Sequence, residues 1–426
     1  MLPPTRPLEL FRPIAGLLCG AALLFVGQGV FLILVPLRLA ADHLSAPAIS
    51  LVGSAYFAGI ITGAWFGDRI IRAVGNIRAY GAFIALILCA CLSLALVGGA
   101  TGWAIMRFLH GAAAAGAFLA IESWLHAATP NQWRGRVVGA YTALSLAGLG
   151  AGQLLINAYG ANAVRSIDLG ALLFAASIAP VMLSKAVAPP LAPMSRRPLM
   201  EVYRHSPVGT AGCFCAGLSM GAFWALGPVF AARSGMSPQG ASLFMATTVF
   251  GGLALVWPFG RLSDLIDRRL ILAGVGFLGT GARLALVTLE REDALALLAL
   301  SAAYGGVIFS LYPLALSQAA DHVSDGQDML EITRGLLLAN GLGMTVGPLI
   351  GAQVIARAGP YGLFLFTAAV TAGISALALW RALRRAPTPP EQRKAFIPMP
   401  ETTPAALPMD PRIPEAQPEL ALHDRA

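Results

Sequence analysis

The sequence predicts an all-α membrane protein in which twelve transmembrane helices form two pseudo-symmetric six-helix halves. Hydrophobic residues make up 57% of the 426 residues, charged residues only 12%, and the mean hydropathy is +0.71, unlike the balance of a soluble domain. The apolar residues fall into runs of about 20, each long enough to cross a hydrocarbon core of about 30 Å as a helix. Such runs are too long for the strands of a membrane barrel.

The two halves are predicted from an internal repeat. Gly-x-Phe-x4-Pro occurs at residues 29–36 and again at 221–228, an offset of 192. Phe-x-Gly-x7-Gly occurs at residues 57–67 and again at 250–260, an offset of 193. A duplicated membrane bundle can rock about a shared cavity, which is how many transporters work. The repeat therefore favours moving a solute over transforming one.

The twelve spans are expected where the apolar runs lie. The first has no cleavage pattern after it, so a retained helix is expected and not a signal peptide. Twelve spans leave no room for a separate soluble catalytic domain, and an enzyme is not expected. In order, the spans are 14–38, 47–70, 77–98, 102–126, 134–157, 166–184, 207–232, 239–262, 269–289, 293–317, 332–356 and 360–383.

Four parts of the chain follow from these spans. Residues 1–184 are expected to form the N-terminal six-helix bundle, and residues 207–385 the C-terminal one. Residues 185–206, with four prolines and four basic residues, are expected to be a cytoplasmic linker between the halves. Residues 386–426 carry ten prolines and little apolar periodicity, which predicts a disordered, dispensable tail in preference to a partner-docking segment.

The basic residues predict the orientation. With the N-terminus in the cytoplasm, that side holds residues 6, 12, 69, 72, 78, 134, 136, 185, 196, 197, 204, 261, 268, 269, 334, 381, 384 and 385, and the other holds only 38, 165, 233, 291 and 357. Eighteen against five places both termini in the cytoplasm of a bacterial inner membrane. The net charge of +8 is scattered over short loops, which favours contact with anionic membrane lipid over nucleic-acid binding.

Metal and disulfide chemistry are not indicated. The five cysteines lie inside predicted spans, where they behave as small apolar residues. The six histidines form no metal-ligand motif, so no metal and no cofactor is expected. We expect a monomer.

Ionisable side chains concentrate in the fourth span, which contains Arg107, His110 and Glu122. An ionisable group at membrane depth costs about 2.5–3.5 kcal/mol on insertion scales and usually faces a cavity or a partner. Fifteen residues of helix separate Arg107 from Glu122 by about 22 Å along the axis and about 60° in azimuth. We expect one polar face directed to an interior path, with Arg107 on the outer side and Glu122 on the inner side.

Each of the three side chains also has a purely structural interpretation. Arg107 can extend to the membrane interface, as arginines near helix ends do. Glu122 can join a helix-packing hydrogen bond or pair with Arg134 or Arg136. His110 can be a packed imidazole or part of a proton path. Proton coupling is suggested because a carboxyl group in such a setting can exchange protons near neutrality.

The same residues resemble a motif of the major facilitator superfamily. The pattern R-x-x-x-G-x-x-A-A is matched by Arg107, Gly111, Ala114 and Ala115, with His110 where the family often has glutamine. The resemblance covers residues of about 14–383 and is strongest to a poorly characterised bacterial branch of drug- and metabolite-type facilitators. It implies the twelve-helix facilitator fold and a role for the arginine in proton translocation.

The family's cytoplasmic gate motif, G-x-x-x-D-x-x-x-[GR]-[RK], appears twice. The second half matches it well, at Gly260, Asp264, Arg268 and Arg269. The first half begins at Gly67 but has isoleucine at the position of the acid, with Asp68 and Arg69 nearby. The resemblance implies charges that pair across the halves in one state, and a pairing shifted to Asp68 is an open alternative.

Glycines and polar or aromatic residues complete the candidate site. The fifth span carries a Gly-rich stretch at residues 148–152 that resembles the antiporter motif of facilitators but lacks its proline, and Gly347-Pro348 lies in the eleventh. Antiport is therefore favoured only slightly over symport or uniport. Neutral or aromatic side chains expected to line the cavity, with interfacial or interhelical roles as alternatives, are Gln28, Tyr56, Gln153, Trp224, Tyr304, Tyr312 and Asn340.

These observations predict a secondary active transporter that moves a small organic solute across the inner membrane by rocker-switch alternating access. Proton-coupled efflux is the preferred hypothesis. The alternatives are an uptake symporter for a metabolite, a lipid flippase or scramblase, and a sensor that no longer transports.

Overall fold

The described residues of the computed structural model, 7–158, 163–184, 199–288, 294–323, 326–389 and 392–412, are almost entirely helical. Twelve of their helices are long and apolar enough to cross a membrane, and each predicted span falls on one of them. The predicted fold class is confirmed.

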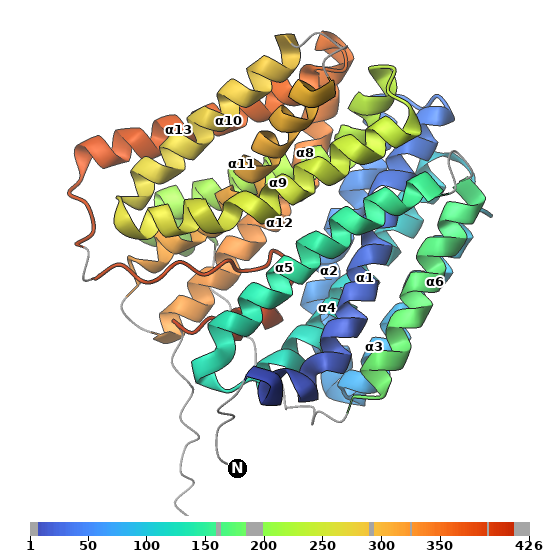
Figure 1. Ribbon diagram of the computed structural model, residues 1–426, viewed down its shortest axis with the longest axis horizontal. Coiled ribbons are helices and arrows are strands. Elements are labelled where there is room, and N and C mark those ends of the chain that lie inside the picture. The colour runs from blue at the N-terminus through green and yellow to red at the C-terminus, as the bar shows by residue number, and fades with distance from the viewer. Residues whose placement is uncertain are drawn as a thin grey trace, which may run out of the picture.

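The first six crossing helices form the N-terminal half, which Figure 1 shows in blue to green. The second six form the C-terminal half, in yellow-green to orange-red. The N-terminal helices are α1 (Pro7–Ala41), α2 (Ala46–Val74), α3 (Asn76–Ser93), α4 (Gly99–Ala128), α5 (Arg134–Leu155) and α6 (Ala163–Met182), with 3-10 turns η1 (Asn131–Trp133) and η2 (Ile156–Ala158). The C-terminal ones are α8 (Pro207–Arg233), α9 (Pro238–Leu265), α10 (Arg268–Thr288), α11 (Ala294–Ala320), α12 (Gly326–Ala358) and α13 (Gly362–Arg384), preceded by the short α7 (Leu199–His205).

Several helix starts follow from local sequence. α2, α8 and α9 each begin with serine followed closely by proline, and the serine hydroxyls of Ser45, Ser206 and Ser237 accept a hydrogen bond from a first-turn backbone N–H. Such caps satisfy donors that have no partner within the helix. α2 is capped at its C-terminal end by Gly75, whose φ of 84° is a conformation that glycine adopts without strain. Short polar segments with such caps thereby separate one apolar helix from the next.

The repeated glycines mark equivalent helix contacts in the two halves. A Cβ on Gly29 of α1 would overlap the carbonyl oxygen of Leu149 on α5, and a Cβ on Gly221 of α8 would overlap that of Met344 on α12. Because α8 and α12 correspond to α1 and α5 in the duplicated order, the repeat preserves one close helix crossing twice. Close approach of backbones is how membrane helices gain packing energy.

Gly221→Ala is therefore expected to destabilise the protein by about 1–3 kcal/mol, because a methyl group must push two backbones apart. Thermal unfolding in detergent, followed by tryptophan fluorescence, measures this. Gly274→Ala on α10 is the matched control, since its added methyl group meets no neighbouring atom within 4 Å. Equal unfolding temperatures for both variants would contradict this account of the repeat.

One end of the bundle carries both the start of α1 and the end of α13, because twelve crossings return the chain to the face where it began; we call it the termini face. Near the opposite face the halves touch directly. The Ser242 hydroxyl of α9 donates to the carbonyl of Gln153 on α5 at 2.7 Å, and Gly53 of α2 lies against Ala225 of α8. The bundle is thus closed near the opposite face.

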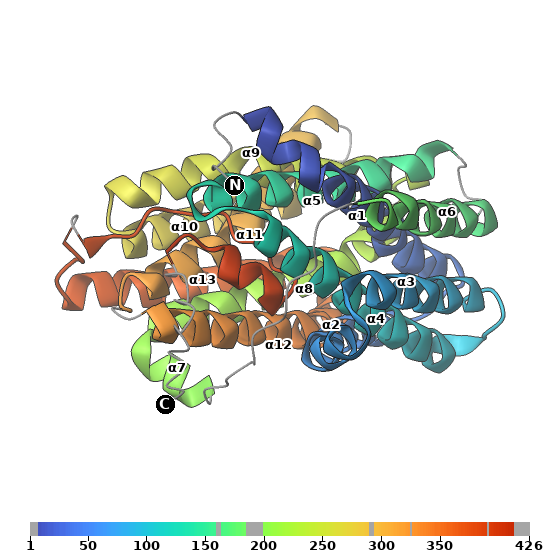
Figure 2. The same ribbon diagram turned by 90° about the horizontal axis from the view of Figure 1, so that it is seen from below.

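The segment after α13 differs from the expected disordered tail. Residues 392–412 run back from the end of α13 and lie between the halves at the termini face, as the red segment in Figures 1 and 2 shows. They contain a 3-10 helix, η4 (Pro404–Met409), whose Leu407 and Met409 are buried. We call residues 392–412 the returning segment. The proline-rich composition predicts disorder, because composition alone does not show how many polar groups of this segment find hydrogen-bond partners in the bundle. Residues 413–426, and residues 185–198 of the expected linker, lie outside the described residues.

Candidate functional site

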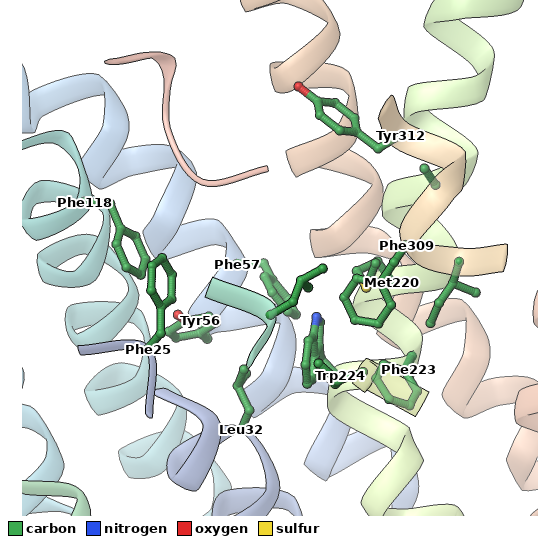
Figure 3. Packing of buried hydrophobic residues seen from close by; sticks show 14 of the residues in the cluster. Phe25, Leu32, Tyr56, Phe57, Phe118, Met220, Phe223, Trp224, Phe309 and Tyr312 are labelled. Atoms are coloured by element: carbon green, nitrogen blue, oxygen red, sulfur yellow. The ribbon is translucent and has the colours of Figure 1, made fainter. Parts of the chain in front are cut away.

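A cavity of about 150 Å³ lies between the two halves; we call it the central cavity. α1, α2, α4 and α5 contribute to one wall, and α8, α9, α11 and α12 to the other. Figure 3 shows the aromatic side chains that face one another across this space. The lining includes Phe25, Leu32, Phe57, Phe118, Leu146, Met220, Val256, Phe309 and Met344, and the returning segment adds Pro398, Met399, Pro400, Glu401 and Thr402.

Three of the seven predicted lining residues line this cavity: Gln28, Tyr56 and Trp224. The Tyr56 hydroxyl donates to Oε1 of Gln28 at 3.4 Å, which links α2 to α1 in the middle of the N-terminal half. Trp224 approaches from α8 in the other half (Figure 3). Both halves therefore present polar or aromatic edges to the same space.

The other four predicted lining residues are placed elsewhere. Gln153 joins the halves near the opposite face through its backbone. Tyr304 packs beneath Arg283, whose guanidinium lies 4.7 Å from the ring centroid, inside the C-terminal half. Tyr312 is fully buried, and the Asn340 amide donates to Oε2 of Glu401 at 3.0 Å. The helical period of the sequence does not distinguish these positions from residues that line the cavity, because several faces of α11 and α12 are buried.

Arg107 and His110 form a buried cluster with Tyr56. The Arg107 guanidinium lies 4.2 Å from the Tyr56 ring centroid, and its Nη1 lies 2.9 Å from Nδ1 of His110. Arginine can only donate, so Nδ1 of His110 must accept and the imidazole is neutral here, with its proton on Nε2. The His110 ring also packs edge-on against Phe31 and Phe174. This arrangement matches the packing interpretation of His110, and Arg107 faces inward and does not extend to the interface.

Glu122 lies near the other end of α4 and is fully buried. Tyr141 of α5 donates its hydroxyl to Oε1 of Glu122 at 3.0 Å. Thr402 and Thr403 of the returning segment donate their hydroxyls to Oε1 and Oε2. All three donors are neutral hydroxyl groups. The backbone N–H of Ala406 also donates to Glu122, which thus lies next to the cavity-lining Thr402 and accepts hydrogen bonds from three hydroxyls and one backbone N–H.

The gate motif of the second half forms a charged cluster with the returning segment. Arg268 donates to Asp321 at 2.7 Å and to Asp264 at 3.0 Å, and it also binds the carbonyl of Lys394. Asp264 in turn accepts from the backbone N–H of Phe396 at 2.9 Å. A Cβ on Gly260 would overlap the Phe396 ring, so the motif's glycine is where this ring packs.

The last arginine of that motif is held locally. Arg269 pairs with Asp267 at 2.7 Å and donates to the carbonyls of Arg381 and Ala386 at the end of α13. The hydrogen bonds from Arg269 lower the pKa of Asp267 against the opposing effect of burial, which is the larger single influence. Arg269 therefore joins the start of α10 to the end of α13.

The first-half gate region reaches across to the other half. Asp68 pairs with Arg72 at 2.6 Å and lies close enough to Arg334 of α12 to interact with it electrostatically. Arg69 lies over the Phe66 ring at 5.4 Å, near the membrane-facing surface of α2. Gly67 packs against Leu119 and Gly116 of α4. The shifted acid, Asp68, is thus the one that faces a cation of the opposite half.

Burial alters the acid–base properties of two carboxyl groups at the termini face. Removal from water raises the pKa of Glu401 to about 7, although the hydrogen bond from Asn340 opposes the shift. Burial also raises the pKa of Asp321 despite its pairing with Arg268. Both groups touch or belong to the returning segment, which sequence analysis assigned to no site.

Comparison with known proteins now decides the family. The sequence model of the Major Facilitator Superfamily matches residues 17–329 and 210–414. The chain belongs to the major facilitator superfamily. An uncharacterized MFS-type transporter of Enterobacter sp. (strain 638) is 30% identical over 386 residues, which cover 89% of this chain and 98% of the relative. The uncharacterized MFS-type transporter YcaD of Salmonella typhi is 29% identical over 380 residues, with the same two coverages.

Solved facilitator structures share the fold of this chain. The nucleoside transporter NupG aligns with a TM-score of 0.71 at 13% identity, covering 87% of this chain and 98% of NupG. A bacterial homologue of the human lysosomal transporter Spinster, solved in an inward-facing and unoccupied conformation, aligns with a TM-score of 0.68 at 16% identity, covering 92% and 99%. This facilitator is a multi-pass transporter of the bacterial inner membrane and not an enzyme.

Proposed function

We propose that this facilitator moves a small organic solute by alternating access, in exchange for protons and in the direction of efflux. Glu122 carries the proposal: it is a buried carboxyl group whose partners, three hydroxyl groups and the backbone N–H of Ala406, carry no charge, and it lies next to Thr402 in the wall of a cavity between duplicated halves. A carboxyl group without a fixed cationic partner can gain and lose a proton as its surroundings change.

The cavity lining supports an amphipathic or weakly charged solute. Aromatic and aliphatic side chains dominate it, and Glu401 is the one charged residue among those that line it in the described part of the chain. A phosphorylated solute would call for several converging cations, which this lining lacks. Arg107 lies behind Tyr56, and we propose that it alters the electrostatic potential of the cavity through that ring.

The conformation and the charge pattern together support the proposed direction. The halves touch near the opposite face, so the cavity is directed toward the termini face. The excess of basic residues supports a cytoplasmic termini face. A facilitator in this conformation would load from the cytoplasm. We propose that Asp68 and Arg334 pair across the halves and separate as the bundle rocks.

Reconstituted liposomes with a pH-sensitive dye inside test this proposal. Addition of a transported solute from a panel of amphipathic cations and neutral compounds is expected to move protons in the direction opposite to the solute. Protons moving in the same direction as the solute would instead indicate uptake symport. Solute movement that leaves the internal pH unchanged would overturn proton coupling, and protein-free liposomes with the same compounds serve as the control.

A second candidate, lipid translocation, rests on a larger cavity of about 320 Å³ between α2 and α12. Ile61, Trp65 and Leu338 line it together with Glu331, Arg334 and parts of the returning segment. Trp65 is 42% exposed, which brings this cavity to the membrane-facing surface. Transfer of labelled phospholipid headgroups between leaflets, without any soluble solute, would favour this function over solute efflux.

A further inference from the structure

The returning segment is bound by both halves through specific polar contacts. On the C-terminal half, the backbone N–H of Lys394 donates to Oδ1 of Asp321 at 3.0 Å, beside the Asp264–Phe396 hydrogen bond already described. On the N-terminal half, the Thr142 hydroxyl of α5 donates to the carbonyl of Pro398 at 2.8 Å. The segment therefore spans the gap between the halves where they would otherwise face the termini side.

Its middle part occupies the polar end of the central cavity. Thr402 and Thr403 supply two of the three hydroxyl donors to Glu122, and Glu401 accepts from Asn340 of α12. Further on, Arg412 pairs with Asp410 at 2.7 Å, and the two side chains are only 5% and 0% exposed. A buried charge pair with hydrogen bonds to its surroundings is a feature of a docked segment and not of a solvated tail.

The volume of the central cavity indicates that the returning segment excludes organic solutes from it. The central cavity measures about 150 Å³ with the returning segment in place. Ligand pockets for organic molecules usually measure about 300–1,000 Å³. Residues 398–402 form part of the cavity wall, so their departure would enlarge the space and leave Glu122 with Tyr141.

From these contacts we infer that residues 394–412 form a tethered plug that competes with the solute for Glu122 and must leave before transport. The inference rests on the proposed function of the central cavity. The two adjacent threonine hydroxyls also indicate what Glu122 accepts: a solute with neighbouring hydroxyl or N–H donors. Only nine residues separate Arg384, the end of α13, from Lys394, and a short tether gives an effective concentration on the order of millimolar.

The first test asks where the segment lies, without using transport. The five native cysteines are replaced by alanine, and Thr142→Cys is introduced beneath Pro398. In detergent, this cysteine is expected to react with a small maleimide at least about tenfold more slowly in the full chain than in a chain that stops before Lys394, because a docked cover limits its exposure. Leu96→Cys, at an 86% exposed loop position, is the matched control and should react equally in both.

The second test asks whether the plug competes. Truncation before Lys394 is expected to raise the apparent affinity for a transported solute by about tenfold, since only the unplugged fraction of the full chain binds it. Thr402→Val should give a smaller gain in the same direction, because it removes one hydroxyl to Glu122. Thr388→Val, on the part of the chain before the returning segment, is its control and should change nothing.

The outcomes separate this inference from the proposed function. Equal labelling of Thr142→Cys in the full and truncated chains would overturn the plug, whatever transport shows. If the cysteine is protected but truncation leaves solute binding unchanged or weaker, the plug does not compete with the solute for Glu122. Protection together with proton-independent transport would overturn the proposed coupling while leaving the plug in place.

Discussion

Glu122→Gln is expected to abolish solute movement driven by a pH gradient in reconstituted liposomes. Glutamine has nearly the same shape and its carbonyl oxygen still accepts hydrogen bonds, so the contact with Tyr141 can persist. It cannot change its charge, however, and a carrier that exchanges protons for solute then loses its proton site. Solute counterflow without a gradient should continue, which separates loss of coupling from loss of folding.

Tyr141→Phe is the matched control for this prediction. It removes one hydrogen bond from Glu122 but keeps the carboxyl group, so gradient-driven transport should continue with a shifted pH dependence. Gradient-driven transport at the wild-type rate in Glu122→Gln would remove Glu122 from the coupling mechanism. In that case Arg107 would be the next group to test, through Arg107→Ala.

Arg268→Met is expected to lower the free energy of unfolding by about 3–5 kcal/mol, because it leaves a buried carboxylate without its partner. The side chains of Arg268 and Asp321 are only 1% and 2% exposed, and the pair joins the start of α10 to the end of α11. Thermal and denaturant unfolding in detergent measure the loss. Arg38→Met removes the cation of an ion pair with Asp42 whose side chains are 46% and 43% exposed, and it should cost no more than about 1 kcal/mol.

A double-mutant cycle makes this second prediction specific. Because each single change leaves one buried charge behind, Arg268→Met with Asp321→Leu should cost less than the sum of the two single losses. Strictly additive losses would mean that Arg268 acts mainly through Asp264, Ser263 and the carbonyl of Lys394. The truncated chain distinguishes that possibility, since it lacks Lys394.

The helices and the family could be predicted from the sequence because their causes are local. A run of about 20 apolar residues crosses a membrane wherever it occurs, and the glycines of the repeat recur because the same close crossings recur. Arg107, Gly111, Ala114 and Ala115 are spaced along one helix, so their motif can be recognised without knowing what α4 touches.

The membership of the candidate site could not be predicted in the same way. Gln28, Tyr56 and Trp224 line the central cavity, whereas Gln153, Tyr304, Tyr312 and Asn340 do not, although their residue types are alike. The relative rotation of each helix decides this, and neighbouring helices set that rotation. The gate motif likewise implies a pairing between the halves, whereas in this structure Asp264 and Arg268 contact each other and the returning segment.

The sequence by itself determined that this chain is a twelve-helix facilitator with a duplicated frame, because hydrophobic length and glycine spacing act within single helices. The sequence also identified Glu122 as a candidate functional residue, because a carboxyl group at membrane depth is energetically costly. Only the tertiary structure decided that Glu122 and Arg107 have separate partners and that threonines 280 and 281 residues further along the chain bind Glu122. Contacts of that range depend on how two bundles and a proline-rich segment meet in space, and no local pattern encodes them.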